Sequence, residues 1–224
     1  MPEKRNYIVG KHYVDKGFNG KHNKDDELQY WNIASNGITI QNSGGIRPRS
    51  FTKEIRSYTT VPSSVYLFEL HYEHKDVENP WRNIVINNDN KIIHCGDALF
   101  DSSDPNKKLS DFKGNKIFKK IYEENKKNPD IDLFCPILHF TKFEEGRAVF
   151  NGLCHITKLE KYFFEHRGHT VENYKVYMDI MHFESVDIEW INSRSTVKDK
   201  KELKLVNSEL GPHGWSKYLE KVLS

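Results

Sequence analysis

Residues 79–100 read NPWRNIVINNDNKIIHCGDALF. Two short apolar runs, RNIVI and KIIHC, flank the Asn/Asp-rich turn NNDN, which is the pattern of a β-hairpin. The second run ends in Gly96 and Asp97, so a carboxylate directly follows the strand. Because hairpin strands are antiparallel, Trp81 and Asp97 are expected near the same end of the sheet.

A flat aromatic ring beside a carboxylate is what a pocket of cytosine size requires. The carboxylate of Asp97 would accept from the exocyclic amine of the base, and the ring of Trp81 would stack on it. Gly96 would allow a backbone to approach the ligand closely. A core tryptophan and a turn aspartate explain the same residues more simply, so the hairpin by itself does not establish a pocket.

Composition narrows the class of protein. The 224 residues are enough for one large domain or two small ones. Three isolated cysteines form no CxxC pair, so neither a zinc knuckle nor a disulfide framework is indicated. The N-terminus lacks an apolar leader segment and no apolar run reaches about 18 residues, so we expect no membrane association and a cytoplasmic protein.

The net charge of +2 is only weak evidence for nucleic-acid binding, and the distribution of charge is more informative. The segment GGIRPRSFTKEIR gathers four basic residues around a single acid, Glu54. A solvated surface and a phosphate-binding face are both compatible with this segment. Its basic residues are Arg47, Arg49, Lys53 and Arg56.

The remaining pattern predicts one β-rich α+β domain whose last helices close one side. A short helix is expected around Leu28–Trp31, and residues 1–37 are treated as an N-terminal extension of the single domain at 1–224. An amphipathic helix is expected within 109–127. Strands are expected at 38–48, 63–74, 133–143, 147–159 and 173–183, and helices at 185–194 and 214–223.

The motifs of several enzyme classes are absent from the sequence. There is no HExxH, GxSxG, P-loop or GxGxxG motif. The Glu202–Lys204 pair of a possible nuclease motif lies in a segment typical of an exposed helix, and the eleven histidines are dispersed. The sequence therefore favours a non-catalytic binding module without metal or cofactor, with a small nuclease of unrecognised site as the alternative.

Several blocks, in the same order, resemble the N-terminal recognition domain of modification-dependent restriction endonucleases of the AspBHI and MspJI kind. The similarity covers most of the chain, from Ser43 to Trp215. The blocks are SGGIRPR, SVYLFELHYEHKDVENPWRNIVINNDNKIIHCGDA, KGNKIFKKIYEE, CPILHFTKF, GRAVFNGLCHI and VENYKVYMDIMHFESVDIEWI. Two positions depart from the family pattern: His94-Cys95 stands where aromatics are usual, and Ala98 stands in place of Asn.

The resemblance implies an SRA-like pseudo-barrel of the PUA superfamily with flanking helices. It further implies that the chain binds duplex DNA and flips out 5-methylcytosine or 5-hydroxymethylcytosine. The family's full enzymes continue into a nuclease domain, so a chain ending at Ser224 is expected to be either an excised recognition domain or a stand-alone reader. A reader of another modified base or of RNA remains an alternative.

The resulting hypothesis assigns residues to two tasks. Asp97 accepts from the base amine, Trp81 stacks on the base, and Tyr72 and His94 are neighbours in the pocket, next to Gly96. The phosphate contacts, or the filling of the vacated stack, are assigned to basic residues. These are Arg47, Arg49, Lys53, Arg56 and Arg82.

Overall fold

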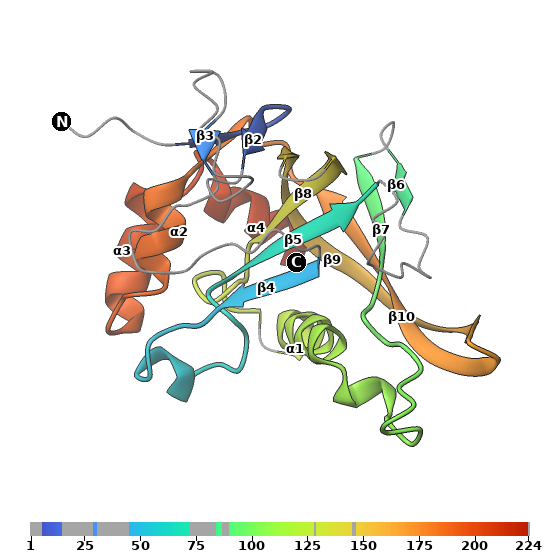
Figure 1. Ribbon diagram of the computed structural model, residues 1–224. Coiled ribbons are helices and arrows are strands. Elements are labelled where there is room, and N and C mark those ends of the chain that lie inside the picture. Colours follow the sequence, from blue (N-terminus) through green and yellow to red (C-terminus); the bar gives the residue numbers. More distant parts are fainter. Residues whose placement is uncertain are drawn as a thin grey trace.

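The computed structural model describes residues 6–14, 29–30, 45–71, 84–86, 90–127, 129–144 and 147–223. Its main feature is a nine-stranded, strongly curved sheet that wraps partly around one helix (Figure 1). The strands are β2 (His12–Val14), β3 (Gln29–Tyr30), β4 (Gly45–Arg49), β5 (Ser64–Leu70), β6 (Ile84–Ile86), β7 (Lys91–Cys95), β8 (Ile137–Glu144), β9 (Arg147–His166) and β10 (His169–Ile180).

The sheet runs in the order β4-β5-β8-β9-β10-β7-β6, with β2 also paired to β9. All pairs along this path are antiparallel except β5 and β8, which are parallel. A parallel pair requires a long crossover, and here the crossover carries β6, β7 and the helix α1 (Lys113–Lys127). The stretch that ends in Asp97 therefore lies inside this crossover.

Apolar residues cover both faces of the sheet. Along β5, Val65 and Leu67 point to one core and Tyr66 and Phe68 to the other, which explains its almost uninterrupted apolar sequence. The first core is closed by α1 through Phe118. The second is closed by the C-terminal helices, whose buried residues include Trp190, Trp215 and Leu219.

The C-terminal part consists of three helices that follow a two-stranded sheet of β1 (Asn6–Ile8) and β11 (Ser185–Asp187). Asp187 caps the first helix by accepting from the backbone N–H of Glu189, and Asp199 caps the second by accepting from Glu202. The helices are α2 (Ile188–Arg194), α3 (Lys200–Glu209) and α4 (Trp215–Leu223), and two 3-10 turns occur earlier in the chain, η2 (Ile55–Ser57) and η4 (Leu109–Asp111).

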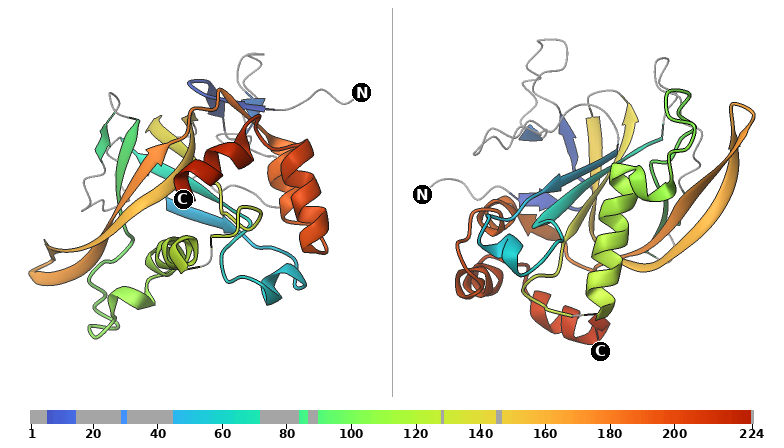
Figure 2. Two further views of the ribbon diagram at one scale, coloured as in Figure 1. Left: turned by 180° about the vertical axis from the view of Figure 1, so that it is seen from behind. Right: turned by 90° about the horizontal axis from the view of Figure 1, so that it is seen from below.

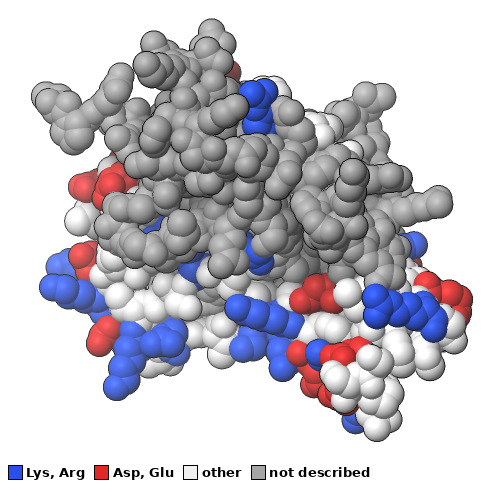
Figure 3. All heavy atoms as spheres, in the orientation of Figure 1, with Lys and Arg blue, Asp and Glu red and all other residues white. Residues whose placement is uncertain are grey.

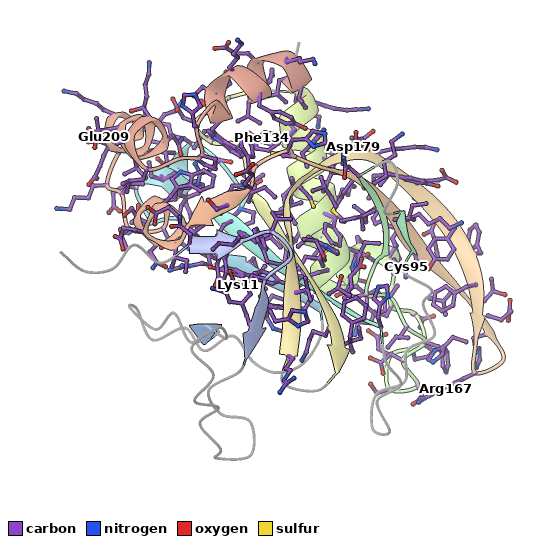
Figure 4. All side chains as sticks on the ribbon, turned by 90° about the horizontal axis from the view of Figure 1, so that it is seen from above. Lys11, Cys95, Phe134, Arg167, Asp179 and Glu209 are labelled. Carbon is purple, nitrogen blue, oxygen red and sulfur yellow. The ribbon has the colours of Figure 1, made fainter. Side chains whose placement is uncertain are left out.

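Strands β9 and β10 leave the sheet as a curved two-stranded ribbon (Figures 1 and 2). The ribbon turns at Arg167 and Gly168, whose φ angles of 52° and 77° are those of a two-residue type I′ turn. Figure 4 labels Arg167 at the tip of this ribbon. The sequence predicted strands at 147–159 and 173–183 but not this extension.

Most other predictions of secondary structure hold. The amphipathic helix is α1, the expected central strand at 173–183 is β10, and the segment containing Glu202 and Lys204 is helical. The short helix expected around Leu28–Trp31 is wrong at Gln29 and Tyr30, which form strand β3 beside β2. None of the helices in the described part of the chain is long and apolar enough to cross a membrane.

Candidate functional site

Asp97 holds the start of helix α1. Its Oδ2 accepts from the backbone N–H of Gly114 at 2.7 Å, and its Oδ1 accepts from the backbone N–H of Asn115 at 2.9 Å. N–H groups in the first turn of a helix have no partner within the helix, and the helix dipole favours a carboxylate there. The half-buried side chain is therefore fixed in place, while each oxygen retains a lone pair for a further donor.

Gly96 lies in a network of two asparagines that joins three of the sequence blocks. The Nδ2 of Asn173 donates to the Gly96 carbonyl at 2.9 Å, and the Nδ2 of Asn115 donates to the Oδ1 of Asn173 at 3.1 Å. A Cβ atom on Gly96 would lie 1.8 Å from the Oδ1 of Asn115. The close approach that this glycine permits is thus occupied by Asn115, and this corrects the expectation that it makes room for a ligand.

His94 belongs to a cluster of three histidines around the carboxylate of Glu69. Its Nδ1 lies 3.0 Å from Oε1 of Glu69, while Nε2 of His139 and of His71 lie 3.3 and 3.6 Å from Oε2. Glu69 and His139 are fully buried. The Nδ2 of Asn151 lies 2.9 Å from Nδ1 of His139, and this contact orients the ring so that its Nε2 faces Glu69.

The charge of this buried carboxylate is stabilised by its neighbours. Burial raises the pKa of Glu69, but the charge of His139 and hydrogen bonds from the three histidines outweigh burial and lower the pKa well below its usual value. Oε2 of Glu69 lies 3.3 Å from Nε2 of His139, a longer contact than the 3.0 Å between Oε1 and His94. A carboxylate oxygen has two lone pairs, so Oε2 can accept a further donor beside the histidines.

Sequence reasoning missed Glu69, although a signal was present. On β5 it shares its strand face with Val65 and Leu67, which are buried, so a carboxylate at this position had to be buried as well. A lone acid in the apolar phase of a strand indicates either a partner or a function. Its partners come from β7 and β8, and these pairings were not predictable from β5 alone.

The basic residues of the β4 region divide into two groups. Arg49 is 7% exposed, and its guanidinium donates to the side chains of Asn192 and Ser195 on α2 and just after it. This position contradicts the expected phosphate contact, because the guanidinium ties β4 to the C-terminal helices. Lys53 and Arg56 are exposed beside η2, and half-buried Arg47 has its pKa lowered by burial.

On the face shown in Figure 3, basic side chains gather along the lower half with acidic ones interspersed. Trp81, Tyr72 and Arg82, expected respectively as stacking residue, pocket neighbour and phosphate contact, lie outside the described residues. Within the described ranges, no group of three or more His, Cys, Asp or Glu side chains is arranged to hold a metal ion.

Comparison with known proteins places this geometry in context. A family model described as "Restriction endonuclease AspBHI N-terminal" matches residues 7–223. No curated protein matches the chain significantly.

Solved structures share the fold at low sequence identity. The MspJI restriction endonuclease in complex with a 27-mer oligonucleotide is 15% identical with a TM-score of 0.73, over 97% of this chain and 52% of that one. The DNA modification-dependent restriction endonuclease AspBHI is 20% identical with a TM-score of 0.66, over 96% and 50%. The DNA recognition domain of the cytosine modification-dependent endonuclease LpnPI is 20% identical with a TM-score of 0.59, over 85% and 81%.

These matches confirm the predicted SRA-like pseudo-barrel with flanking helices. The chain spans about half the length of the MspJI and AspBHI structures, and most of the LpnPI recognition domain.

Proposed function

Because the chain belongs to the family of AspBHI-type restriction endonuclease N-terminal domains, we propose that it binds duplex DNA containing a modified cytosine. In this proposal it is the recognition module of a modification-dependent restriction endonuclease. The modified base, 5-methylcytosine or 5-hydroxymethylcytosine, is flipped out of the duplex into a pocket. The observation that carries the proposal is the carboxylate of Asp97, held in place by backbone donors from α1.

Asp97 is proposed to read the exocyclic amine of the base. Both oxygens are already oriented by N–H groups of α1, so no rotamer freedom remains to be lost when a base arrives. The free lone pairs then accept from the N4 amine of cytosine, which is a donor, whereas the corresponding O4 of thymine is an acceptor. The fixed carboxylate thus favours cytosine over thymine.

Glu69 is proposed as a second acceptor in the same region. It is bonded to His94, which lies only three residues before Asp97 on the same chain segment. Its Oε2 has two lone pairs and can accept a further donor beside His139, and the histidines stabilise its charge. Two fixed acceptors near the end of β7 suit the amine edge of a flipped base better than one.

The cost of flipping the base determines how much binding free energy the pocket must supply. Flipping a base costs a few kcal/mol, which stacking and hydrogen bonds in the pocket must return. Burying one methyl carbon contributes only about 0.8 kcal/mol, or roughly four-fold in affinity. Stronger discrimination between modified and unmodified cytosine therefore requires an apolar wall shaped around the methyl group, and Trp81 and Tyr72 are proposed to contribute to it.

The phosphate contacts are proposed for the exposed residues Lys53 and Arg56, together with Arg47 and Arg82. Arg49 is excluded from this set by its burial against α2.

The proposal is tested by titrating matched duplexes that differ only in one cytosine, which is unmodified, methylated or hydroxymethylated. The Asp97→Asn and Glu69→Gln variants are compared with Glu209→Gln, an exposed position on α3. Because all three cytosines carry the same amine, the series also includes a duplex with thymine at this position. We expect the first two variants to lose at least about ten-fold of the preference for the modified duplex over the thymine duplex, the loss of one hydrogen bond to a charged group, while Glu209→Gln retains it.

The ratio of two affinities is the informative quantity, because partial unfolding lowers both affinities equally. Equal binding of all three cytosine duplexes by the unaltered protein would contradict the proposed function. Preference retained in both Asp97→Asn and Glu69→Gln would remove these carboxylates from the pocket. Efficient competition by RNA, or metal-dependent cleavage by this chain alone, would support the alternative functions instead.

A further inference from the structure

A second pocket lies between the β9–β10 ribbon and the loop that leads from Asp97 to α1. We call it the ribbon pocket, and its volume is about 660 Å³. This volume falls within the range of pockets for small organic ligands, about 300–1,000 Å³. Its lining includes Phe100, Phe112, Phe163, Lys107, Lys108 and Lys161. In the view from below, the ribbon and the loop lie side by side (Figure 2, right).

The two walls of the ribbon pocket are fixed to each other. The backbone N–H of Phe100 in the loop donates to Nδ1 of His166 on the ribbon at 3.1 Å. The ring of Phe100 also stacks on His169, with centroids 3.6 Å apart and planes 8° from parallel. The pocket is therefore preformed, so a ligand does not have to order the loop on binding.

The chemistry of the lining combines aromatic faces with cations. Phe163 is 66% exposed, an unusual position for a large apolar ring on a ribbon that projects into solvent. Lys107 lies 4.8 Å from the centroid of Phe112, so its ammonium stands beside an aromatic wall. A planar base flanked by a phosphate is the ligand that matches rings and ammonium groups placed side by side.

The acidic residues of the pocket do not prevent phosphate binding. Lys107 pairs with Asp101 at 3.2 Å and Lys161 with Glu172 at 2.8 Å, and all four side chains are about 30–59% exposed. Exposed ion pairs contribute about 0–1 kcal/mol, so a phosphate can displace them. Lys108 is exposed and makes no ion pair with another described residue.

The position of the pocket relative to Asp97 identifies the source of the nucleotide. Phe100 is three residues after Asp97, and three residues span at most about 11 Å. Successive nucleotides in one DNA strand are about 3.4 Å apart along the axis. Phe100, in the wall of the pocket, thus lies within about three nucleotide spacings of a base read by Asp97.

We propose that the ribbon pocket binds one nucleotide flanking the modified base, with its base against Phe163 and its phosphate near Lys108. This inference rests on the proposed function, because it takes Asp97 as the position of the flipped base. It adds a contact outside the base pocket, through which the chain can respond to the sequence beside the modification.

The test couples a protein variant to a change in the DNA. Methylated duplexes carry one abasic nucleotide at each of the three positions on either side of the modified cytosine, and Kd is measured for the unaltered chain, Phe163→Ala and Phe163→Tyr. Stacking one base on an aromatic side chain is worth about 1–3 kcal/mol, which corresponds to about 5- to 150-fold in Kd. We expect Phe163→Ala to weaken binding by this factor and Phe163→Tyr to restore it.

At one flanking position, the abasic substitution should weaken binding by the unaltered chain but not by Phe163→Ala. Lys108→Gln should flatten the salt dependence of Kd, and Leu205→Ala, at an apolar position on α3 that is 53% exposed, should change nothing.

The proposal would be overturned if Phe163→Ala left Kd unchanged. It would also be overturned if Phe163→Ala raised Kd by the same factor for every abasic duplex. So would binding of free deoxynucleoside monophosphate that depends on Phe163 while DNA binding does not. These results are distinguishable from failure of the proposed function, in which the unaltered chain shows no preference for methylated DNA at all.

Discussion

Replacing Glu69 by glutamine should destabilise the domain strongly and change how its stability depends on pH. The substitution preserves shape but removes the charge that the histidines surround. Glu69 is fully buried, accepts from His94 at 3.0 Å and lies 3.3 Å from His139. A glutamine has an oxygen at only one of the two carboxylate positions, so its NH2 group faces either His94 or His139 in place of an acceptor.

The magnitude follows from the contacts that are lost. A hydrogen bond to a charged group contributes about 1.5–3 kcal/mol, and breaking a buried ion pair costs about 3–5 kcal/mol. Because glutamine keeps one acceptor, we expect the free energy of unfolding to fall by about 2–4 kcal/mol at pH 7. Domains of this size are stable by about 5–15 kcal/mol, so the variant should still fold.

The pH dependence has a definite sign. The pKa of Glu69 is lower in the folded state than its ordinary value of 4.5, so the unfolded chain binds this proton more readily. The stabilisation is therefore complete above about pH 4.5 and is lost as the pH falls through the folded-state pKa. The glutamine variant has no such group, so the difference between the two proteins should shrink in acid.

The assay is urea unfolding followed by tryptophan fluorescence, since Trp190 and Trp215 are buried in the core. It is repeated between pH 7 and pH 3 for the unaltered chain, Glu69→Gln and the exposed control Glu209→Gln. The control should stay within about 0.5 kcal/mol of the unaltered chain. A loss below about 1 kcal/mol for Glu69→Gln at pH 7, or a loss that is constant down to pH 3, would refute the reasoning.

Three further predictions concern the neighbouring structure. Gly96→Ala should lower the free energy of unfolding by about 1–3 kcal/mol in urea titrations, because its Cβ would lie 1.8 Å from Oδ1 of Asn115. An unchanged free energy of unfolding would mean that the Asn115 side chain moves aside without cost. Arg49→Met should reduce the free energy of unfolding, because the guanidinium of Arg49 is hydrogen-bonded to α2. The salt dependence of DNA binding, measured by anisotropy, should stay the same, and a weaker dependence would show that Arg49 contacts phosphates. Lys53→Gln and Arg56→Gln should each reduce the slope of log Kd against log salt concentration by about 1, without loss of thermal stability. Unchanged slopes would show that these residues do not contact phosphates.

Local sequence patterns determined much of this protein. Runs of β-forming and apolar residues predicted β5 and β10, and the amphipathic repeat predicted α1. The ordered blocks indicated the family and with it the fold. The strands and the helix were predictable because each depends on residues within about ten positions of one another, where backbone geometry sets the period.

The candidate site itself was decided by tertiary structure. Asp97 could be predicted as a site residue from its position after a strand, but its hydrogen bonds to α1 come from residues 17 and 18 positions away. Glu69 meets His94 across 25 positions, and Arg49 meets Asn192 across 143. Whether a charged side chain faces solvent or a buried partner depends on which strands and helices become neighbours. That choice is made by packing of the whole chain, because burial of a charge is tolerated only where distant residues supply its partners.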